Sequence, residues 1–135
     1  MGEEIAADDF LILCEKMPKK TSIIIDTDPG HDDALAILLL ERSCLFDIRA
    51  ITTVAGNSSV EDTTNNARYV LDLIKSKTPI YSGAEKPLTR ELITAEVHGK
   101  GGLAGSVITK RERLTKNASQ KIIELVRENP GEISI

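Results

Sequence analysis

Four aspartates lie within eight consecutive residues of the chain, at Asp26, Asp28, Asp32 and Asp33. Carboxylates within about 5 Å repel one another, and one takes up a proton unless solvent, a helix end or a cation compensates the charge. A helix N-terminus contributes only about 0.3–1 kcal/mol per charge. The segment also leads from an apolar run through Pro29 directly into an apolar helix, which disfavours spreading into solvent. The pattern therefore favours a bound cation.

The candidate ligands in this segment are all oxygen atoms, and no cysteine is close in sequence. Oxygen ligation selects hard cations, and flexible carboxylates suit the high coordination number of Ca²⁺ better than the strict octahedron of Mg²⁺. We therefore expect a Ca²⁺ site. The competing interpretation is structural: Asp32 caps a helix, and the neighbouring aspartates are exposed at the surface.

The elements that must position these aspartates alternate between strands and helices. Short apolar runs bounded by turn residues predict strands at 21–25, 48–54, 79–81 and 133–135. Helices are predicted from Ala34 to about Arg42, from Ser58 or Ser59 through Ile74, and from Asn117 or Ser119 to about Glu128. This alternation indicates an α/β fold with a mostly parallel sheet flanked by helices. Ligands of such sheets bind beyond the carboxyl ends of the strands, where residues 26–33 and 56–57 fall.

Composition and net charge exclude several other classes of function. The 135 residues suit one domain, 19–135, preceded by an N-terminal extension or leader at 1–18. A net charge of −4 and a 3% aromatic content argue against nucleic-acid binding. The sequence has no apolar run long enough for a membrane span and no basic leader, so we expect no membrane partner and a cytoplasmic location. Two cysteines without metal-ligand spacing predict free thiols in a reducing compartment.

The segment Asp26-Thr27-Asp28-Pro29-Gly30-His31-Asp32-Asp33-Ala34 resembles the N-terminal signature of the inosine-uridine-preferring nucleoside hydrolases, Asp-x-Asp-Pro-Gly-x-Asp-Asp-Ala. The resemblance continues at 51–57, 79–83, 86–88, 97–99 and 129–133, and so runs from about Lys19 to the last residue. It implies a Rossmann-like nucleoside hydrolase fold. It also implies Ca²⁺-dependent hydrolysis of ribonucleosides to ribose and free base, in purine and pyrimidine salvage.

The resemblance also implies roles for matching residues. Asp28 would bind Ca²⁺ and act as general base toward water at the metal, and Asp33 would be a further ligand. Asp32 would ligate or lie beside the metal while it accepts the ribose 2′-hydroxyl. Asp26 would support the cluster through hydrogen bonds, and Asn57 would contact the sugar.

The two histidines differ in what they are expected to do. His98 lies in a glycine-rich loop that could close over the ligand, although a surface loop histidine would read the same way. His31 takes a variable position of the family signature, and helix geometry turns it away from its neighbours. We therefore expect a substrate contact from His98 and none from His31.

Enzymes of that family are much longer than this chain, so the resemblance implies the truncated N-terminal part of the domain, with half of the site. A partial gene product and an assembly with a second polypeptide, such as a homo-oligomer, stay open at this point. Two other functions also stay open. One is a non-catalytic domain that binds a cation or ribose. The other is a phosphohydrolase of the haloacid-dehalogenase type with Asp26 as nucleophile, which Pro29-Gly30 fits poorly.

Overall fold

The computed structural model describes residues 19–95, 99, 101–103 and 117–135. The elements, in chain order, are β1 (Thr21–Thr27), α2 (His31–Arg42), β2 (Phe46–Thr53), α3 (Val60–Leu73), β3 (Ile80–Ser82), α4 (Ala118–Glu128) and β4 (Ile133–Ser134). Every strand and helix predicted from the sequence is therefore present. The extension predicted for residues 1–18 lies outside the described part. No helix among the described residues is long and apolar enough to cross a membrane.

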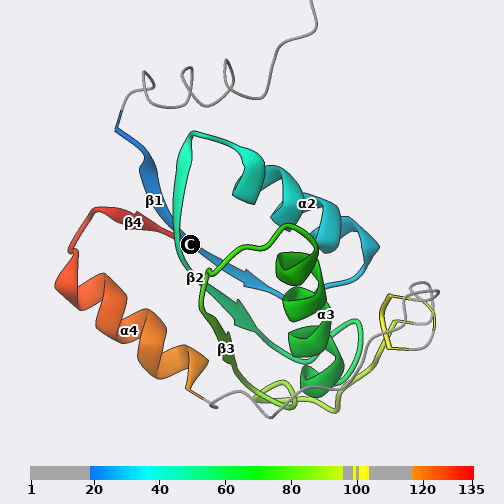
Figure 1. Cartoon of the computed structure of the whole chain (residues 1–135). Coiled ribbons are helices and arrows are strands. Elements are labelled where there is room, and N and C mark those ends of the chain that lie inside the picture. Colours follow the sequence, from blue (N-terminus) through cyan, green and yellow to red (C-terminus); the bar gives the residue numbers. More distant parts are fainter. Residues whose placement is uncertain (1–18, 96–98, 100, 104–116) are drawn as a thin grey trace, which may run out of the picture.

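The four strands form one sheet in the order β3-β2-β1-β4, and each neighbouring pair is parallel. Helices α2 and α3 lie on one side of this sheet and α4 lies on the other (Figure 1). The α/β architecture with a parallel sheet flanked by helices is thus confirmed. Right-handed crossovers that step from β1 to β2 to β3 place α2 and α3 on one face. The connection that returns from β3 to β4 runs in the opposite direction and places α4 on the other face.

Strand β1 is apolar without alternation because both of its faces are covered. Ile24 is 3% exposed and packs with Ala50 and with Leu125 of α4. The next residue, Ile25, packs on the opposite side against a cluster that includes Ile37 of α2 and residues of α3. Successive side chains of a strand point to opposite faces, so a strand between two layers needs apolar residues at consecutive positions.

The carboxyl ends of β1, β2 and β3 lie side by side. Thr27 at the end of β1 pairs with Thr53, and Thr53 pairs with Ser82 at the end of β3. The segments that follow these strands therefore leave the sheet at one edge. This is the arrangement that the sequence predicts for the polar residues at 26–33 and 56–57.

One prediction from composition is wrong. Cys44, in the turn between α2 and β2, is part of a disulfide rather than a free thiol. Cysteine usage therefore does not support a reducing compartment.

Candidate active site

Asp28 and Asn57 meet beyond the ends of β1 and β2, although they are 29 residues apart in sequence. Asp28 follows β1 directly, is half-buried, and accepts a hydrogen bond at Oδ2 from the backbone N–H of Asn57 at 2.7 Å. The side-chain Nδ2 of Asn57 donates to the backbone carbonyl of Asp28 at 2.9 Å. Two residues that the sequence places at the same edge of the sheet are thus in direct contact.

Gly56 leaves the space that the Asp28 carboxylate occupies. A Cβ atom at this position would lie 2.1 Å from Asp28 Oδ2 and 2.8 Å from its Cγ, far inside van der Waals contact. The sequence identifies Gly56-Asn57 only as a turn at a strand end. The structure adds that residue 56 must lack a side chain for the carboxylate to reach the N–H of Asn57.

Asp33 stabilises the start of α2. Its Oδ2 accepts from the backbone N–H of Gly30, the N-cap residue, at 3.3 Å, and its Oδ1 accepts from the Thr27 hydroxyl at 2.8 Å. A carboxylate at the third helical position that binds the N-cap N–H is half of a capping box. The structural alternative assigned helix capping to Asp32, but the capping carboxylate is that of Asp33. Asp32 lies in the first turn and is exposed.

Asp26 is held from the neighbouring strand. Its Oδ1 accepts a 2.6 Å hydrogen bond from the hydroxyl of Thr52, its register partner on β2. Because Asp26 and Thr27 are consecutive in a strand, their side chains leave the sheet on opposite faces. Asp26 and Asp33, which bonds to Thr27, are therefore stabilised on different faces of the sheet.

The donor chemistry of this corner suits a hard cation, although the described residues supply only part of a coordination shell. Oδ1 of Asp28 accepts no hydrogen bond from another described residue, so this oxygen is available to a ligand. Within the described ranges, no group of three or more His, Cys, Asp or Glu side chains is arranged to hold a metal ion. The metal-binding roles of Asp28, Asp32 and Asp33 stay predictions.

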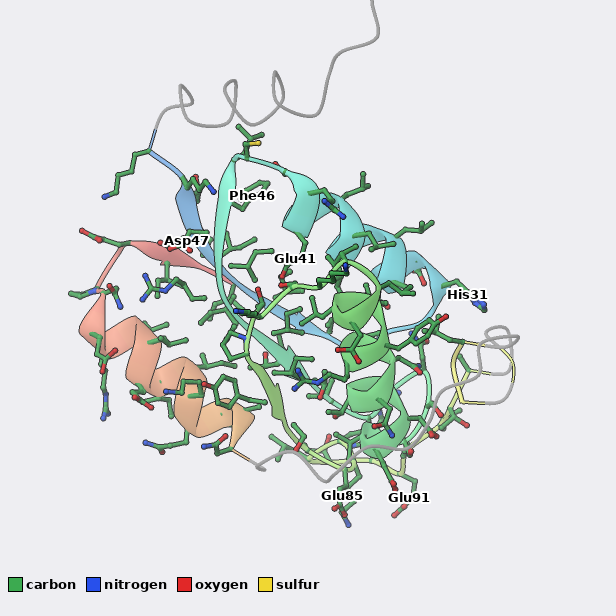
Figure 2. The ribbon with its side chains drawn as sticks, in the orientation of Figure 1. His31, Glu41, Phe46, Asp47, Glu85 and Glu91 are labelled. Atoms are coloured by element: carbon green, nitrogen blue, oxygen red, sulfur yellow. The ribbon has the colours of Figure 1, made fainter. Side chains whose placement is uncertain are left out.

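The two histidines are placed differently. His31 is the first residue of α2 and is exposed, with its side chain directed away from the body of the protein (Figure 2). The expectation that it makes no direct contact with a substrate stays a prediction. His98 lies outside the described residues, so its proposed contact with the ligand stays a prediction.

Asn66 is a residue of this corner that the sequence predictions missed. It lies on α3, is fully buried, and donates from Nδ2 to the backbone carbonyl of Pro29, next to Asp28, at 2.9 Å. A signal was present in the sequence: Asn66 falls on the same helical face as Ala67 and Val70, which the periodicity assigns to the core. A polar residue on an apolar helix face indicates a specific hydrogen bond.

Comparison with known proteins identifies relatives of the chain. A family model described as inosine-uridine preferring nucleoside hydrolase matches residues 23–135. Among curated proteins, the pyrimidine-specific ribonucleoside hydrolase RihA of Salmonella arizonae is 42% identical over 84% of this chain. An uncharacterised protein of Schizosaccharomyces pombe is 46% identical, also over 84% of the chain. The chain spans 38% of the length of each of these two relatives.

Solved structures agree with the sequence matches. A plant nucleoside hydrolase, PpNRh1, superposes with a TM-score of 0.76 at 35% identity, over 85% of this chain and 38% of that protein. An inosine-guanosine nucleoside hydrolase gives a TM-score of 0.73 at 29% identity, over 83% of this chain and 37% of that one. The parallel sheet and its helices therefore have the arrangement seen in the corresponding part of these proteins.

Proposed function

Because the chain belongs to the inosine-uridine preferring nucleoside hydrolase family, we propose that the protein hydrolyses the N-glycosidic bond of ribonucleosides to ribose and free base. The observation that carries this proposal is the Asp28 carboxylate, fixed through Oδ2 by the N–H of Asn57 at 2.7 Å. Its other oxygen is free to take a proton. A carboxylate held in one orientation at a ligand-binding edge suits general-base catalysis.

In the proposed reaction, Asp28 takes a proton at Oδ1 from the water that attacks the anomeric carbon, while the bond from that carbon to the base breaks. The base leaves with the bonding electron pair and takes a proton from solvent to become the free base. Cleavage of a glycosidic bond develops positive charge on the sugar ring. The negative charge of Asp33 at the start of α2 favours this charge distribution, and Asp28 contributes its own charge until it takes the proton. Both roles require the carboxylates to be held in a fixed orientation.

The sugar would be held by residues next to Asp28. Asp32 is exposed at the start of α2 and can accept the ribose 2′-hydroxyl. Asn57 donates one N–H of Nδ2 to the carbonyl of Asp28, which leaves its second N–H and its amide oxygen for a contact with the sugar. Asp26 keeps a supporting role, because Thr52 fixes its carboxylate one residue before the strand ends.

Asp28, Asp32 and Asp33 would hold the cofactor, for which Ca²⁺ fits the oxygen donors. A bound divalent cation supplies Lewis acidity that makes a nearby water easier to deprotonate. Among the described residues the carboxylates do not complete a shell, so further ligands would come from elsewhere in the protein. A cytoplasmic location, a role in salvage and a homo-oligomeric state stay predictions.

The proposal is tested by incubating the purified protein with inosine or uridine in phosphate-free buffer, with Ca²⁺ or with a calcium chelator. We expect free base and ribose in equal amounts, with release reduced by the chelator. The absence of phosphate distinguishes hydrolysis from phosphorolysis. Failure to release base from any ribonucleoside would overturn the proposal and favour the non-catalytic alternative. Phosphatase activity with a phosphorylated Asp26 would instead support the haloacid-dehalogenase alternative.

A further inference from the structure

Asn66 joins two segments that are distant in sequence. Its Nδ2 donates to the Pro29 carbonyl at 2.9 Å and to the Gly101 carbonyl at 2.8 Å, across 37 and 35 residues. Both partners are carbonyl oxygens, so the amide nitrogen must face them. A single buried side chain on α3 therefore connects the turn after β1 with the segment that contains Gly99, Gly101 and Gly102, which we call the glycine segment.

The glycine segment is shaped to make this contact. Gly102 has φ +84°, and a Cβ atom there would lie 3.0 Å from Asn66 Nδ2 and 3.4 Å from the Pro29 carbonyl oxygen. Gly101 has φ +77° and no other atom near the position of a Cβ. Both residues adopt a backbone conformation that favours glycine, but only Gly102 also needs the missing side chain to pack against Asn66.

An asparagine side chain is energetically unfavourable at this core position. Asn66 is completely buried, and its Oδ1 has no hydrogen-bond partner in the described part of the chain. An unpaired buried acceptor opposes folding, whereas an apolar residue beside Ala67 and Val70 would not carry that penalty. The two hydrogen bonds that Nδ2 donates are therefore the interactions that favour asparagine at this position.

Those hydrogen bonds act on the backbone that carries Asp28. The carbonyl groups of Asp28 and Pro29 are consecutive, and each accepts from a side-chain amide, of Asn57 and Asn66 respectively. Asn57 also fixes the Asp28 carboxylate directly. Two asparagines that follow β2 thus hold the main chain on which the proposed base is carried.

We propose that Asn66 is a positioning residue: through the Pro29 and Gly101 carbonyls it locks the turn that carries Asp28 and couples it to the glycine segment. The importance of this coupling for catalysis rests on the proposed function, but the coupling itself does not. The proposed coupling predicts that loss of the Asn66 contacts loosens the Asp28–Asn57 hydrogen bond while the neighbouring sheet stays intact.

The matched pair Gly102→Ala and Gly101→Ala tests this by amide hydrogen exchange. Both variants place a side chain on a positive φ, but only Gly102→Ala places a methyl group tightly against Asn66, 3.0 Å from its Nδ2. We expect exchange at the Asn57 N–H to be about fivefold faster in Gly102→Ala than in Gly101→Ala, a local opening rather than global unfolding. The Ile51 N–H, bonded to the Pro79 carbonyl at 2.9 Å, reports the sheet and should exchange equally in both.

The second pair is Asn66→Ala and Thr64→Val. Thr64 is also buried on α3, but its hydroxyl contacts Val60 and Thr53 rather than the carbonyls of Pro29 and Gly101. We expect Asn66→Ala to accelerate exchange at Asn57 about tenfold relative to Ile51, and Thr64→Val to change both amides by the same factor. Equal acceleration of both amides in Asn66→Ala would make the residue merely structural and overturn the proposal. If Asn66→Ala does not fold, the comparison of Gly102→Ala with Gly101→Ala decides whether Asn66 locks the turn.

Activity provides the catalytic readout. With inosine or uridine as substrate, kcat should fall about 100-fold in Asn66→Ala, the usual consequence of misplacing a catalytic group by about 1 Å. Thr64→Val should retain kcat within a few-fold of the starting protein. If the unmodified protein hydrolyses no nucleoside, the proposed function fails, and the hydrogen-exchange results still decide whether Asn66 locks the turn.

Discussion

Replacing Asp28 with asparagine is expected to lower kcat for ribonucleoside hydrolysis by about 10³–10⁴-fold, near the upper range for loss of a general base. Asparagine has the same shape and can still accept the N–H of Asn57 through its amide oxygen, so the turn should persist. It cannot take a proton from water, and it removes a negative charge from the site. Steady-state release of ribose, measured together with the midpoint of thermal unfolding, checks this result.

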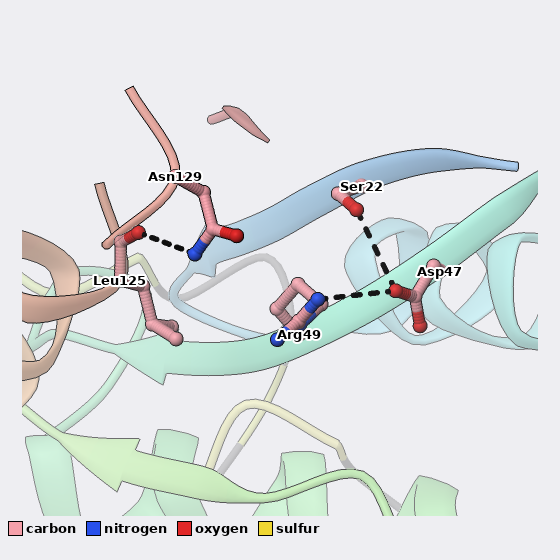
Figure 3. A network of polar contacts seen from close by, with 5 residues as sticks. All are labelled: Ser22, Asp47, Arg49, Leu125 and Asn129. Carbon is pink, nitrogen blue, oxygen red and sulfur yellow. Dashed lines mark hydrogen bonds and ion pairs between the residues drawn. The ribbon is translucent and has the colours of Figure 1, made fainter. Parts of the chain in front are cut away.

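Asp47→Asn is the matched control for the loss of a carboxylate. Asp47 is an exposed residue near the amino end of β2, where it contacts Ser22 and Arg49 at 3.5 Å each (Figure 3). It lies at the end of the sheet opposite the proposed site, and its substitution should leave kcat unchanged. A nearly normal rate in Asp28→Asn would remove Asp28 as the base. Equal losses in both variants would show that the effect is not local.

Gly56→Ala is expected to lower kcat about 100-fold because the added methyl group takes the place of the Asp28 carboxylate. The Cβ would lie 2.1 Å from Oδ2, so the carboxylate must rotate away and lose its hydrogen bond to the Asn57 N–H. The chemical groups of the site all remain present in this variant. The experiment therefore measures how much of the rate depends on the orientation of Asp28.

Gly131→Ala provides the control for glycine replacement. Gly131 has φ +74° and no other atom within 4 Å of a Cβ position, so the substitution strains the backbone without crowding a neighbour. We expect a small loss of stability and a normal kcat. If Gly56→Ala also keeps a normal kcat while it remains folded, the orientation of the Asp28 carboxylate does not limit the reaction.

The layout of the fold could be predicted because its signals are local. The unalternating run at 21–25 predicts a strand covered on both faces, and Ile24 and Ile25 pack into separate clusters on the two sides of the sheet. The prediction of where α2 starts was less accurate. The helix begins at His31 rather than near Ala34, because Asp33 accepts the N–H of Gly30 and so stabilises an additional turn.

The candidate site could be predicted only as far as the sheet edge determines it. The rule that parallel strands end together brings Asp28 to Asn57. The contact between Asp26 and Thr52 depends on register, which shifts between Ile23 and Ile24 so that Ile24 pairs with Ala50. The sequence pattern contains no signal for that irregularity, and without it Asp26 would lie opposite a different residue of β2.

Contacts that depend on loop conformation also could not be predicted from the sequence. The polar residue at position 66 on an apolar helix face indicates a buried hydrogen bond, but its partners are backbone carbonyls of Pro29 and Gly101. Backbone carbonyls occur at every position, so residue types do not identify which of them an amide will reach. Only the packing of α3 against both segments determines this.

We expect the carboxylates that follow β1, those of Asp28, Asp32 and Asp33, to bind Ca²⁺ beside the substrate, and isothermal titration calorimetry of the protein with Ca²⁺ measures this binding. Binding should be saturable, should weaken at least about tenfold in Asp28→Asn, in line with the loss of a charged ligand, and should not change in Asp47→Asn. Absence of Ca²⁺ binding, or an unchanged affinity in Asp28→Asn, would contradict this expectation.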